Sequence, residues 1–338
     1  MGAFRRLLLE RRDQARPPRG RRNPNRARPL RTHRSARRRA CGKRAREGCE
    51  LSENFDRRLT PARPDLAASF LKGRIEAARY ADGVVMQVKE GVVDVKREPR
   101  PDAALDTQAL YGECVTVYDE EEGWAWGQLS RDGYVGWIAA NTLWSRIYQP
   151  THMVCVPRTF AYPRPGIKDP PLLGLPLGAE VEIVDRRDNF LVTGEGGFIF
   201  ARHLREIAAP VEDFVAVAEK LTSAPYLWGG RSSLGIDCSG LVQCALLLAG
   251  LRPPRDSDQQ QDQLGEAVEP GAPLRRGDLI FWKGHVGVMR DPQILLHANA
   301  AHMMVASEPL EEVRARNIRA GAGDVTAIKR LGGIAEAS

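Results

Sequence analysis

A cysteine at a predicted helix start is the residue of this chain best suited to nucleophilic chemistry. Cys238 follows Asp237 and a glycine-rich loop, and it stands just before an apolar run at 241–248. The first turn of a helix presents unpaired backbone N–H groups and the positive end of the helix dipole, which favour a thiolate. We therefore predict that Cys238 is a nucleophile with a lowered pKa, whereas Cys244, within the apolar run, is expected to pack as a small hydrophobic residue.

Two histidines downstream can supply the base and the orienting group that a cysteine nucleophile requires. His285 and His297 fall on neighbouring predicted strands, and Gly284 and Gly287 clear space beside the first ring. The alternation of a strand aims such a ring at one face of the sheet. A lone strand histidine is usually structural, but two of them after such a cysteine favour catalysis. We predict His285 as the base and His297 as the orienting group.

The segment that must position these residues has the pattern of an α+β domain, which we place at 210–332. Apolar residues at three- and four-residue spacings predict helices at 211–222 and 238–249, whereas 256–263 is rich in Asp and Gln and is expected to be a solvated loop. The remaining predicted elements are strands at 278–282, 285–289, 294–298 and 325–328 and a helix at 310–320. Helices followed by antiparallel strands are typical of α+β domains.

Upstream of that domain, short alternating strands broken by Gly, Asp and Pro predict small β-barrels. The candidate strands are 92–95, 114–118, 124–129 and 134–138. The stretch 178–204 repeats the scheme of 112–143 at an offset of about 65 residues, which is the size of one small barrel. We therefore predict two tandem barrels, at 80–146 and 150–207, with a linker at 51–79.

The positive charge of the chain is concentrated at its N-terminus. Residues 1–50 hold 18 Lys and Arg against four acidic residues, whereas 51–338 hold 32 basic and 39 acidic residues. The overall charge of +7 therefore does not indicate a nucleic-acid partner for the folded part. The Arg- and Pro-rich composition of 1–50 predicts disorder. Such a segment could be a nucleic-acid or membrane arm, but we favour an over-extended translation start with the true beginning near Leu51.

Several function classes find no support in the composition. The six cysteines form no Cys-x-x-Cys pair and no metal-ligand spacing with histidine, so we expect no disulfide framework, metal or cofactor. Reduced thiols favour a cytoplasmic location. Residues 1–10 do not have the pattern of a signal peptide, and the sequence contains no apolar run of the length that a membrane-spanning helix needs.

Four motifs in order resemble the signature of the NlpC/P60 cysteine peptidases. They are Pro-Tyr-Leu-Trp-Gly-Gly at 225–230, Asp-Cys-Ser-Gly-Leu-Val at 237–242, Gly-His-Val-Gly at 284–287 and His-Ala-Asn at 297–299. Together with two predicted barrels, they make 80–330 similar to the subgroup that acts as γ-D-glutamyl-L-diamino acid endopeptidases, or dipeptidyl peptidase VI. The resemblance implies a papain-like catalytic domain preceded by two bacterial SH3-like barrels.

The resemblance also implies a reaction and a substrate. The Cys238 thiolate would attack the amide carbonyl between γ-linked D-Glu and a diamino acid of a peptidoglycan-derived peptide, giving an acyl-enzyme that water resolves, while His285 moves the proton. Tyr226 would line the oxyanion site beside the backbone N–H of Cys238. Asp237 and Ser239 would help to bind the free amine of an N-terminal L-Ala. An aromatic residue of the first barrel would close the site, and Tyr134 is our choice for it.

Other interpretations of these residues remain open from the sequence. Asp237 can cap the helix that follows, with or without binding an amine, and Tyr134 can equally be a packed barrel residue. Trp228 is expected to pack its loop rather than touch substrate. The function could instead be that of a papain-like amidase or acyltransferase on another substrate, or of a non-catalytic module that binds wall peptides. The leading hypothesis is an endopeptidase acting on muropeptides already released from the wall, in cell-wall turnover or recycling.

Overall fold

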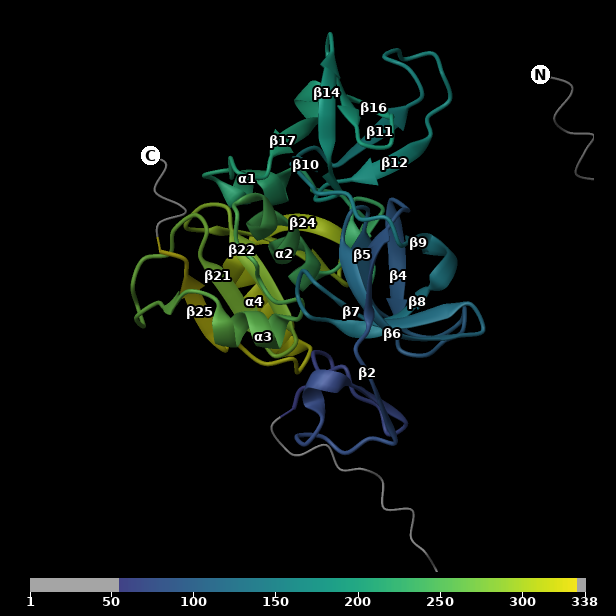
Figure 1. Ribbon diagram of the computed structural model, residues 1–338. Helices are drawn as coiled ribbons and strands as arrows, with labels where there is room; N and C mark the ends of the chain where they lie inside the picture. Colours follow the sequence, from purple (N-terminus) through teal and green to yellow (C-terminus); the bar gives the residue numbers. More distant parts are fainter. Residues whose placement is uncertain (1–54, 333–338) are drawn as a thin grey trace, which may run out of the picture. The chain divides into compact units, whose positions relative to one another are not determined.

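The computed structural model describes residues 55–332 (Figure 1). The segment 1–50, for which the sequence predicts disorder, lies outside these residues. Within 55–332, none of the helices combines the length and apolar character needed to cross a membrane.

The C-terminal part is built on a six-stranded antiparallel sheet with the order β20-β25-β21-β22-β23-β24. Its strands are β20 (Glu266–Ala267), β21 (Leu279–Trp282), β22 (His285–Met289), β23 (Ile294–Asn299), β24 (Met304–Pro309) and β25 (Ala327–Arg330). The helices are α1 (Phe214–Glu219), α2 (Cys238–Leu248), α3 (Ser257–Gln263) and α4 (Leu310–Arg319). A short hairpin of β18 (Arg231–Ser232) and β19 (Gly235–Ile236) precedes α2.

The alternation of side chains along the sheet explains how α2 and α4 are placed. On β21, Leu279 and Phe281 join the core that includes α2, whereas Ile280 and Trp282 join a separate core with residues of α4. Successive strand residues point to opposite faces, so one apolar run serves two helices. Every residue of α2 is buried, and this explains why its sequence is apolar all round rather than amphipathic.

Two predicted elements of this part differ from the structure. Helix α1 is shorter than the expected 211–222, because Asp213 caps it by accepting a hydrogen bond from the backbone N–H of Ala216 at 3.1 Å. The expected loop at 256–263 is instead helix α3, which begins after Asp256. The backbone N–H of Asp256 donates to the side chain of Gln259, and buried Gln260 donates to the carbonyl of Ser239 at 3.0 Å. Helix α3 is therefore stabilised by polar contacts rather than by an apolar stripe.

Two β-rich segments precede the C-terminal part. The first is a seven-stranded antiparallel sheet with β3 (Val84–Val88), β4 (Val92–Lys96), β5 (Leu105–Leu110), β6 (Cys114–Glu121), β7 (Trp124–Leu129), β8 (Val135–Ala139) and β9 (Leu143–Trp144). The second forms two small sheets with β10 (His152–Val154), β11 (Arg158–Tyr162), β12 (Leu173–Pro176), β13 (Glu180–Val181), β14 (Ile183–Arg187), β15 (Phe190–Thr193), β16 (Phe198–Phe200) and β17 (Leu204–Glu206). A single 3₁₀ turn joins the last two strands in each, η2 (Ala140–Thr142) and η3 (Ala201–His203).

Part of the expected linker at 51–79 is instead structured. Strands β1 (Leu66–Ala68) and β2 (Arg79–Ala81) pair in parallel around the turn η1 (Ser69–Leu71). Their apolar residues share a core with Trp126 and Trp137, and the guanidinium of Arg63 lies 4.6 and 4.9 Å from these two rings. The segment is therefore a packed extension of the seven-stranded sheet.

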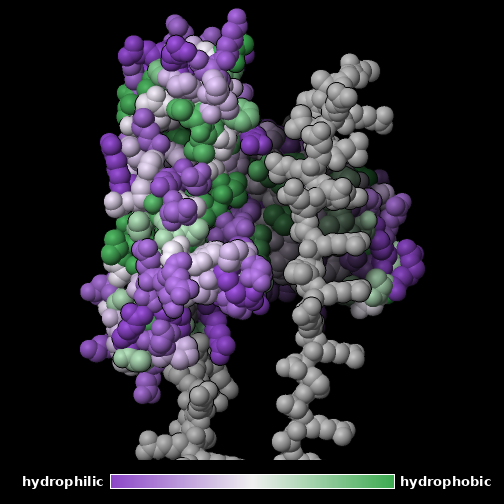
Figure 2. Space-filling view, turned by 90° about the vertical axis from the view of Figure 1, so that its right-hand side faces the viewer, coloured by the Kyte–Doolittle hydropathy of each residue, from purple (hydrophilic) through white to green (hydrophobic). Residues whose placement is uncertain are grey.

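The surface carries apolar residues in small patches. On the face shown in Figure 2, hydrophilic residues cover most of the top and bottom, and hydrophobic ones gather in patches between them. The exposed large apolar residues of the β-rich segments are Val84, Val85, Phe160, Ile167, Leu172 and Val184. Apolar atoms make up much of any protein surface, so small patches of this kind do not require a partner.

A buried charge cluster ties the β-rich segments to the loop before α2. The side chain of Glu113 is fully buried and lies 3.0 Å from Arg131 and 3.3 Å from Arg231. Arg131 also pairs with Glu180 of β13 at 2.8 Å, and Arg231 donates to the carbonyl of Gln108 on β5 at 2.7 Å. One carboxylate therefore holds two guanidinium groups that come from different parts of the fold.

We expect Glu113→Ala to lower the urea midpoint of unfolding by the equivalent of about 3–5 kcal/mol, because buried Arg231 loses its anion and buried Arg131 keeps only Glu180. Glu98→Ala is the matched control, since Glu98 pairs with Arg100 at an exposed site and should change the midpoint little. Equal midpoints for the two variants would show that the buried cluster does not stabilise the fold.

Candidate active site

Cys238 begins helix α2 at the floor of a cleft of about 300 Å³. The carboxylate of Asp237 caps the helix by accepting from the backbone N–H of Gly240 at 2.7 Å, and it also accepts from the N–H of Gly229 at 2.8 Å. The capping role predicted for Asp237 is therefore present. The side chain fixes both the helix start and the glycine loop around the thiol.

The thiol is buried, and this reverses the expected direction of its pKa. Burial, with the nearby charge of Asp237, raises the pKa of Cys238 to about 12, although backbone N–H groups of Val286 and Ser239 act in the opposite direction. The prediction of a lowered pKa was wrong because sequence position reveals the helix start but not the burial of the sulfur. Cys238 is therefore a neutral thiol at neutral pH.

The two histidines contact each other directly. They lie on the adjacent strands β22 and β23, with Nε2 of His285 2.8 Å from Nδ1 of His297. Burial lowers the pKa of His285 to about 3, and the charge on His297 acts in the same direction. Both catalytic candidates of the resting site are therefore uncharged. The N–H of Val286, the residue after His285, reaches the Cys238 thiol, so the start of β22 lies against the start of α2.

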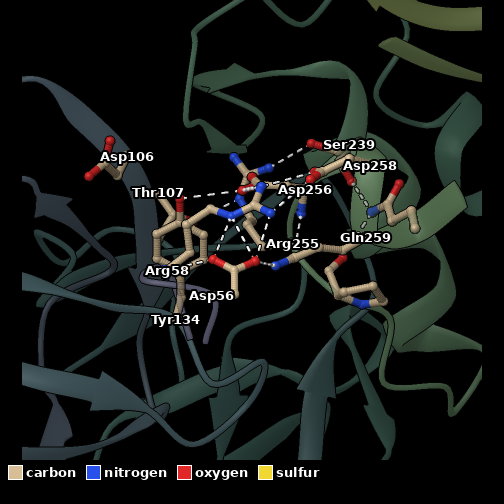
Figure 3. Close-up of polar contacts among 12 residues, drawn as sticks. Asp56, Arg58, Asp106, Thr107, Tyr134, Ser239, Arg255, Asp256, Asp258 and Gln259 are labelled. Carbon is tan, nitrogen blue, oxygen red and sulfur yellow. Dashed lines mark hydrogen bonds and ion pairs between the residues drawn. The ribbon is translucent and has the colours of Figure 1, made fainter. Parts of the chain in front are cut away.

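The predicted amine ligands Asp237 and Ser239 already have a buried cation. Arg255 is about 1% exposed and lies 2.7 Å from Asp237 Oδ2 and 3.0 Å from Oδ1. The same guanidinium donates to Ser239 Oγ at 2.9 Å and to Thr107 Oγ1 of β5 at 2.7 Å (Figure 3). Asp237 and Ser239 line the cleft, but the negative charge of Asp237 is compensated by Arg255.

A second group of acidic residues lines the cleft at some distance in sequence from Cys238. Tyr134 lies there (Figure 3), and its hydroxyl donates a hydrogen bond to Asp256 Oδ2 at 3.4 Å. Burial raises the pKa of Tyr134, with the charge of Asp256 acting in the same direction. Asp106, paired with Arg97 at 2.6 Å, lines the same cleft. The structure thus brings Tyr134 to the cleft that contains Cys238.

Arg58 joins these acidic residues and was not found from the sequence. Its Nε and Nη2 donate to Asp56, and Nη1 and Nη2 donate to Asp258. Nη1 also donates to Asp256 Oδ2 at 2.8 Å. An arginine has five N–H donors, so the guanidinium is saturated. Its partners Asp256 and Asp258 are about 200 residues away in the chain, and neither a motif nor a periodicity could have connected them to Arg58.

Two aromatic residues complete the cleft. Tyr226 lines it, and burial, reinforced by the charge of Asp237, raises the pKa of its hydroxyl, which therefore remains a donor. Trp228 is 67% exposed at the rim, so the expectation that it packs its loop was wrong. The left-handed Gly229, next to it, leaves no room for a side chain, because a Cβ there would lie 2.9 Å from Leu105 Cγ and 3.2 Å from the backbone of Asp106. Trp228 lines the cleft.

Comparisons with known proteins agree with these features. Residues 223–319 match the NlpC/P60 family, and 95–143 match the bacterial dipeptidyl-peptidase Sh3 domain. The chain is 30% identical to a gamma-D-glutamyl-L-lysine dipeptidyl-peptidase of Bacillus cereus, over 61% of this chain and 71% of that protein, and 32% identical to one of Bacillus subtilis, over 58% and 73%. It is 28% identical to dipeptidyl-peptidase 6 of Lysinibacillus sphaericus, over 64% and 88%.

A solved structure is similar in fold. An NlpC/P60 family protein from Bacillus cereus superposes with a TM-score of 0.62 at 22% identity, covering 73% of this chain and 99% of that one. The chain belongs to the NlpC/P60 family and is a cysteine-type peptidase.

The buried neutral histidines predict a pH dependence of stability. The pKa of His285 is about 3 in the folded state against 6.5 for the free side chain, so the unfolded chain binds more protons between these values. The free energy of unfolding should fall as the pH is lowered from 6.5, by up to about 1.4 kcal/mol per pH unit for each such group. His285→Gln should have a shallower loss between pH 6.5 and about 5, measured by urea unfolding. If the free energy of unfolding fell equally with pH in the native protein and in His285→Gln, the buried His285 would not be the source of the pH dependence.

Proposed function

We propose that this peptidase hydrolyses the amide bond between γ-linked D-Glu and a diamino acid in peptidoglycan-derived peptides with a free N-terminal L-Ala. The observation that carries the proposal is a single cleft lined both by Cys238 and by the acidic residues Asp106 and Asp256. The names of the relatives from Bacillus, gamma-D-glutamyl-L-lysine dipeptidyl-peptidase, support the same bond type.

The proposed reaction passes through an acyl-enzyme. Cys238 Sγ attacks the amide carbonyl while its proton moves to His285, which matches the neutral resting state of both groups. The oxyanion accepts hydrogen bonds from the Cys238 backbone N–H and the Tyr226 hydroxyl. His285 then protonates the departing amine of the diamino acid, leaving a thioester. Water, deprotonated by His285, cleaves the thioester and frees the D-Glu side-chain carboxylate.

We assign the substrate ammonium to the acidic wall rather than to Asp237. In the wall, Asp106, Asp256 and Asp258 line the cleft with the cations Arg58 and Arg97, and Asp56 joins them through its ion pair with Arg58. The wall has two more carboxylates than guanidinium groups, whereas the charge of Asp237 is balanced by Arg255. Burial raises the pKa of Asp256, and an ammonium ion beside it would favour the charged form. Asp237 and Ser239 would then affect substrate binding only indirectly, by holding Arg255 in the wall of the cleft.

The same wall supports a preference for short released peptides. Arg58, Tyr134 and Asp256 line the same cleft as Cys238, and with the ammonium bound at this wall a peptide that continued beyond its N-terminal residue would meet them. We therefore propose a role in turnover of peptides already freed from the wall, rather than on the intact wall.

The domain organisation that accompanies this function is also a proposal. We divide the chain into SH3-like barrels at 80–146 and 150–207 and a peptidase domain at 210–332. The recurring order of strand, 3₁₀ turn and strand, β8-η2-β9 and β16-η3-β17, supports a second copy of the first barrel.

Free-amine recognition is tested with L-Ala-γ-D-Glu-diamino acid and its N-acetylated form. Loss of a charged hydrogen-bonded contact should lower kcat/KM for the blocked peptide by roughly 100-fold. Cys238→Ala should hydrolyse neither. Equal rates on both peptides would exclude amine recognition, and hydrolysis of other amides but not of either peptide would favour a papain-like amidase.

The acidic wall is tested with Asp256→Asn. Asparagine caps a helix as well as aspartate does, so α3 should persist while the charge is lost. KM for the free peptide should rise about 10-fold or more, with a smaller change for the acetylated peptide. Asp262→Asn, an exposed change on the same helix, is the control and should leave both values unaltered. If Asp256→Asn raised KM equally for the free and the acetylated peptide, the substrate ammonium would have to bind elsewhere.

A further inference from the structure

A buried carboxylate continues the hydrogen-bond chain behind the two histidines. On neighbouring strands β23 and β24, His297 pairs in register with Ala306, and Glu308 stands two residues further along the same face. Glu308 Oε1 lies 2.9 Å from His297 Nε2, and the residue is only 8% exposed. No sequence pattern selects Glu308, because the residue lies outside the four motifs.

Charged and polar groups surround Glu308 from several elements. Arg316 of α4 binds both carboxylate oxygens, at 2.5 and 2.9 Å. His302 Nδ1 and Asn299 Nδ2 lie 3.4 and 3.5 Å from Oε1. Burial alone would raise the pKa of Glu308, but the hydrogen bonds from His297 and Arg316 outweigh it and hold the pKa at about 2. Glu308 is therefore a fixed anion throughout the neutral pH range.

The anion determines where the protons lie in both histidines. An ionised carboxylate can only accept, so His297 Nε2 carries the proton and donates to Glu308. His297 Nδ1 is then unprotonated and accepts from His285 Nε2–H across 2.8 Å. His285 Nδ1 is consequently the nitrogen left with a free lone pair. That nitrogen is the one available to take the proton of Cys238.

We propose that Glu308 is a positioning residue that fixes the tautomers of His285 and His297 and stabilises the positive charge that develops on His285 when Cys238 loses its proton. The inference rests on the proposed assignment of Cys238 and His285 as nucleophile and base. Glu308 would be the fourth group in the series that begins with Cys238, His285 and His297. Arg316 is joined to this series through its ion pair with Glu308.

The test is the pH dependence of Cys238 alkylation by iodoacetamide in the full chain without substrate, followed by mass spectrometry of the Cys238 peptide. Glu308→Gln can donate as well as accept and carries no charge, so it should slow alkylation at pH 7 about 10-fold and move the midpoint upward by about one pH unit. Glu308→Asp should restore part of the rate. Glu311→Gln is the matched control, since Glu311 is exposed on the first turn of α4.

Two further measurements keep this inference separate from folding and from the proposed function. If Glu308→Gln lowers the urea midpoint but leaves the alkylation profile unchanged, Glu308 is structural and the inference fails. If His285→Ala also leaves the profile unchanged, the Cys238–His285 assignment itself fails. In the native protein, long-range ¹H–¹⁵N spectra of labelled histidines should show unprotonated Nδ1 in both His285 and His297, and a protonated Nδ1 in either would overturn the tautomer assignment.

Discussion

The ion pair between Asp237 and Arg255 is the interaction on which the rest of the site depends. Its carboxylate caps helix α2 and thereby fixes the position of Cys238, while the guanidinium reaches Thr107 in the seven-stranded sheet. Removing one partner of a buried pair leaves an uncompensated charge that costs about 3–5 kcal/mol, so neither group tolerates the absence of the other. The start of α2 and strand β5 are therefore held in one arrangement, and the cleft between them is set by the fold rather than by substrate.

Burial of this site has a chemical consequence for the nucleophile. A preformed thiolate and imidazolium would both have to be charged away from water, and burial instead favours the neutral pair. Charge is then created only when the proton moves from Cys238 to His285. Groups that stabilise that charge contribute most at this step. The hydrogen bonds from His285 to His297 and from His297 to the anion Glu308 are placed to stabilise a positive charge on the base. The resting structure and the proposed reaction are consistent because the charge is transient.

The parts of the site that the sequence predicts correctly are those encoded by local patterns. A cysteine before an apolar run indicates a helix start, and alternation indicates the strands of His285 and His297. Helix α3 was predicted as a loop because its stability comes from the Asp256 cap and buried glutamine contacts, which leave no apolar periodicity. The segment 66–71 was predicted as a linker because its partners, Trp126 and Trp137, are distant in sequence. Burial, and with it the direction of the Cys238 pKa, is not visible in a motif.

Arg58 shows why such long-range contacts matter for specificity. Three carboxylates, Asp56, Asp256 and Asp258, surround one guanidinium, and like charges at this spacing would repel strongly without it. Because Arg58 uses all its donors on them, it holds the acidic wall together without offering a donor to a substrate. The arginine lies in the segment before the seven-stranded sheet, so a chain cut at residue 80 would keep the nucleophile and both histidines yet lose the cation that assembles the wall. In the proposed function, selection of the substrate therefore depends on a segment outside the peptidase motifs.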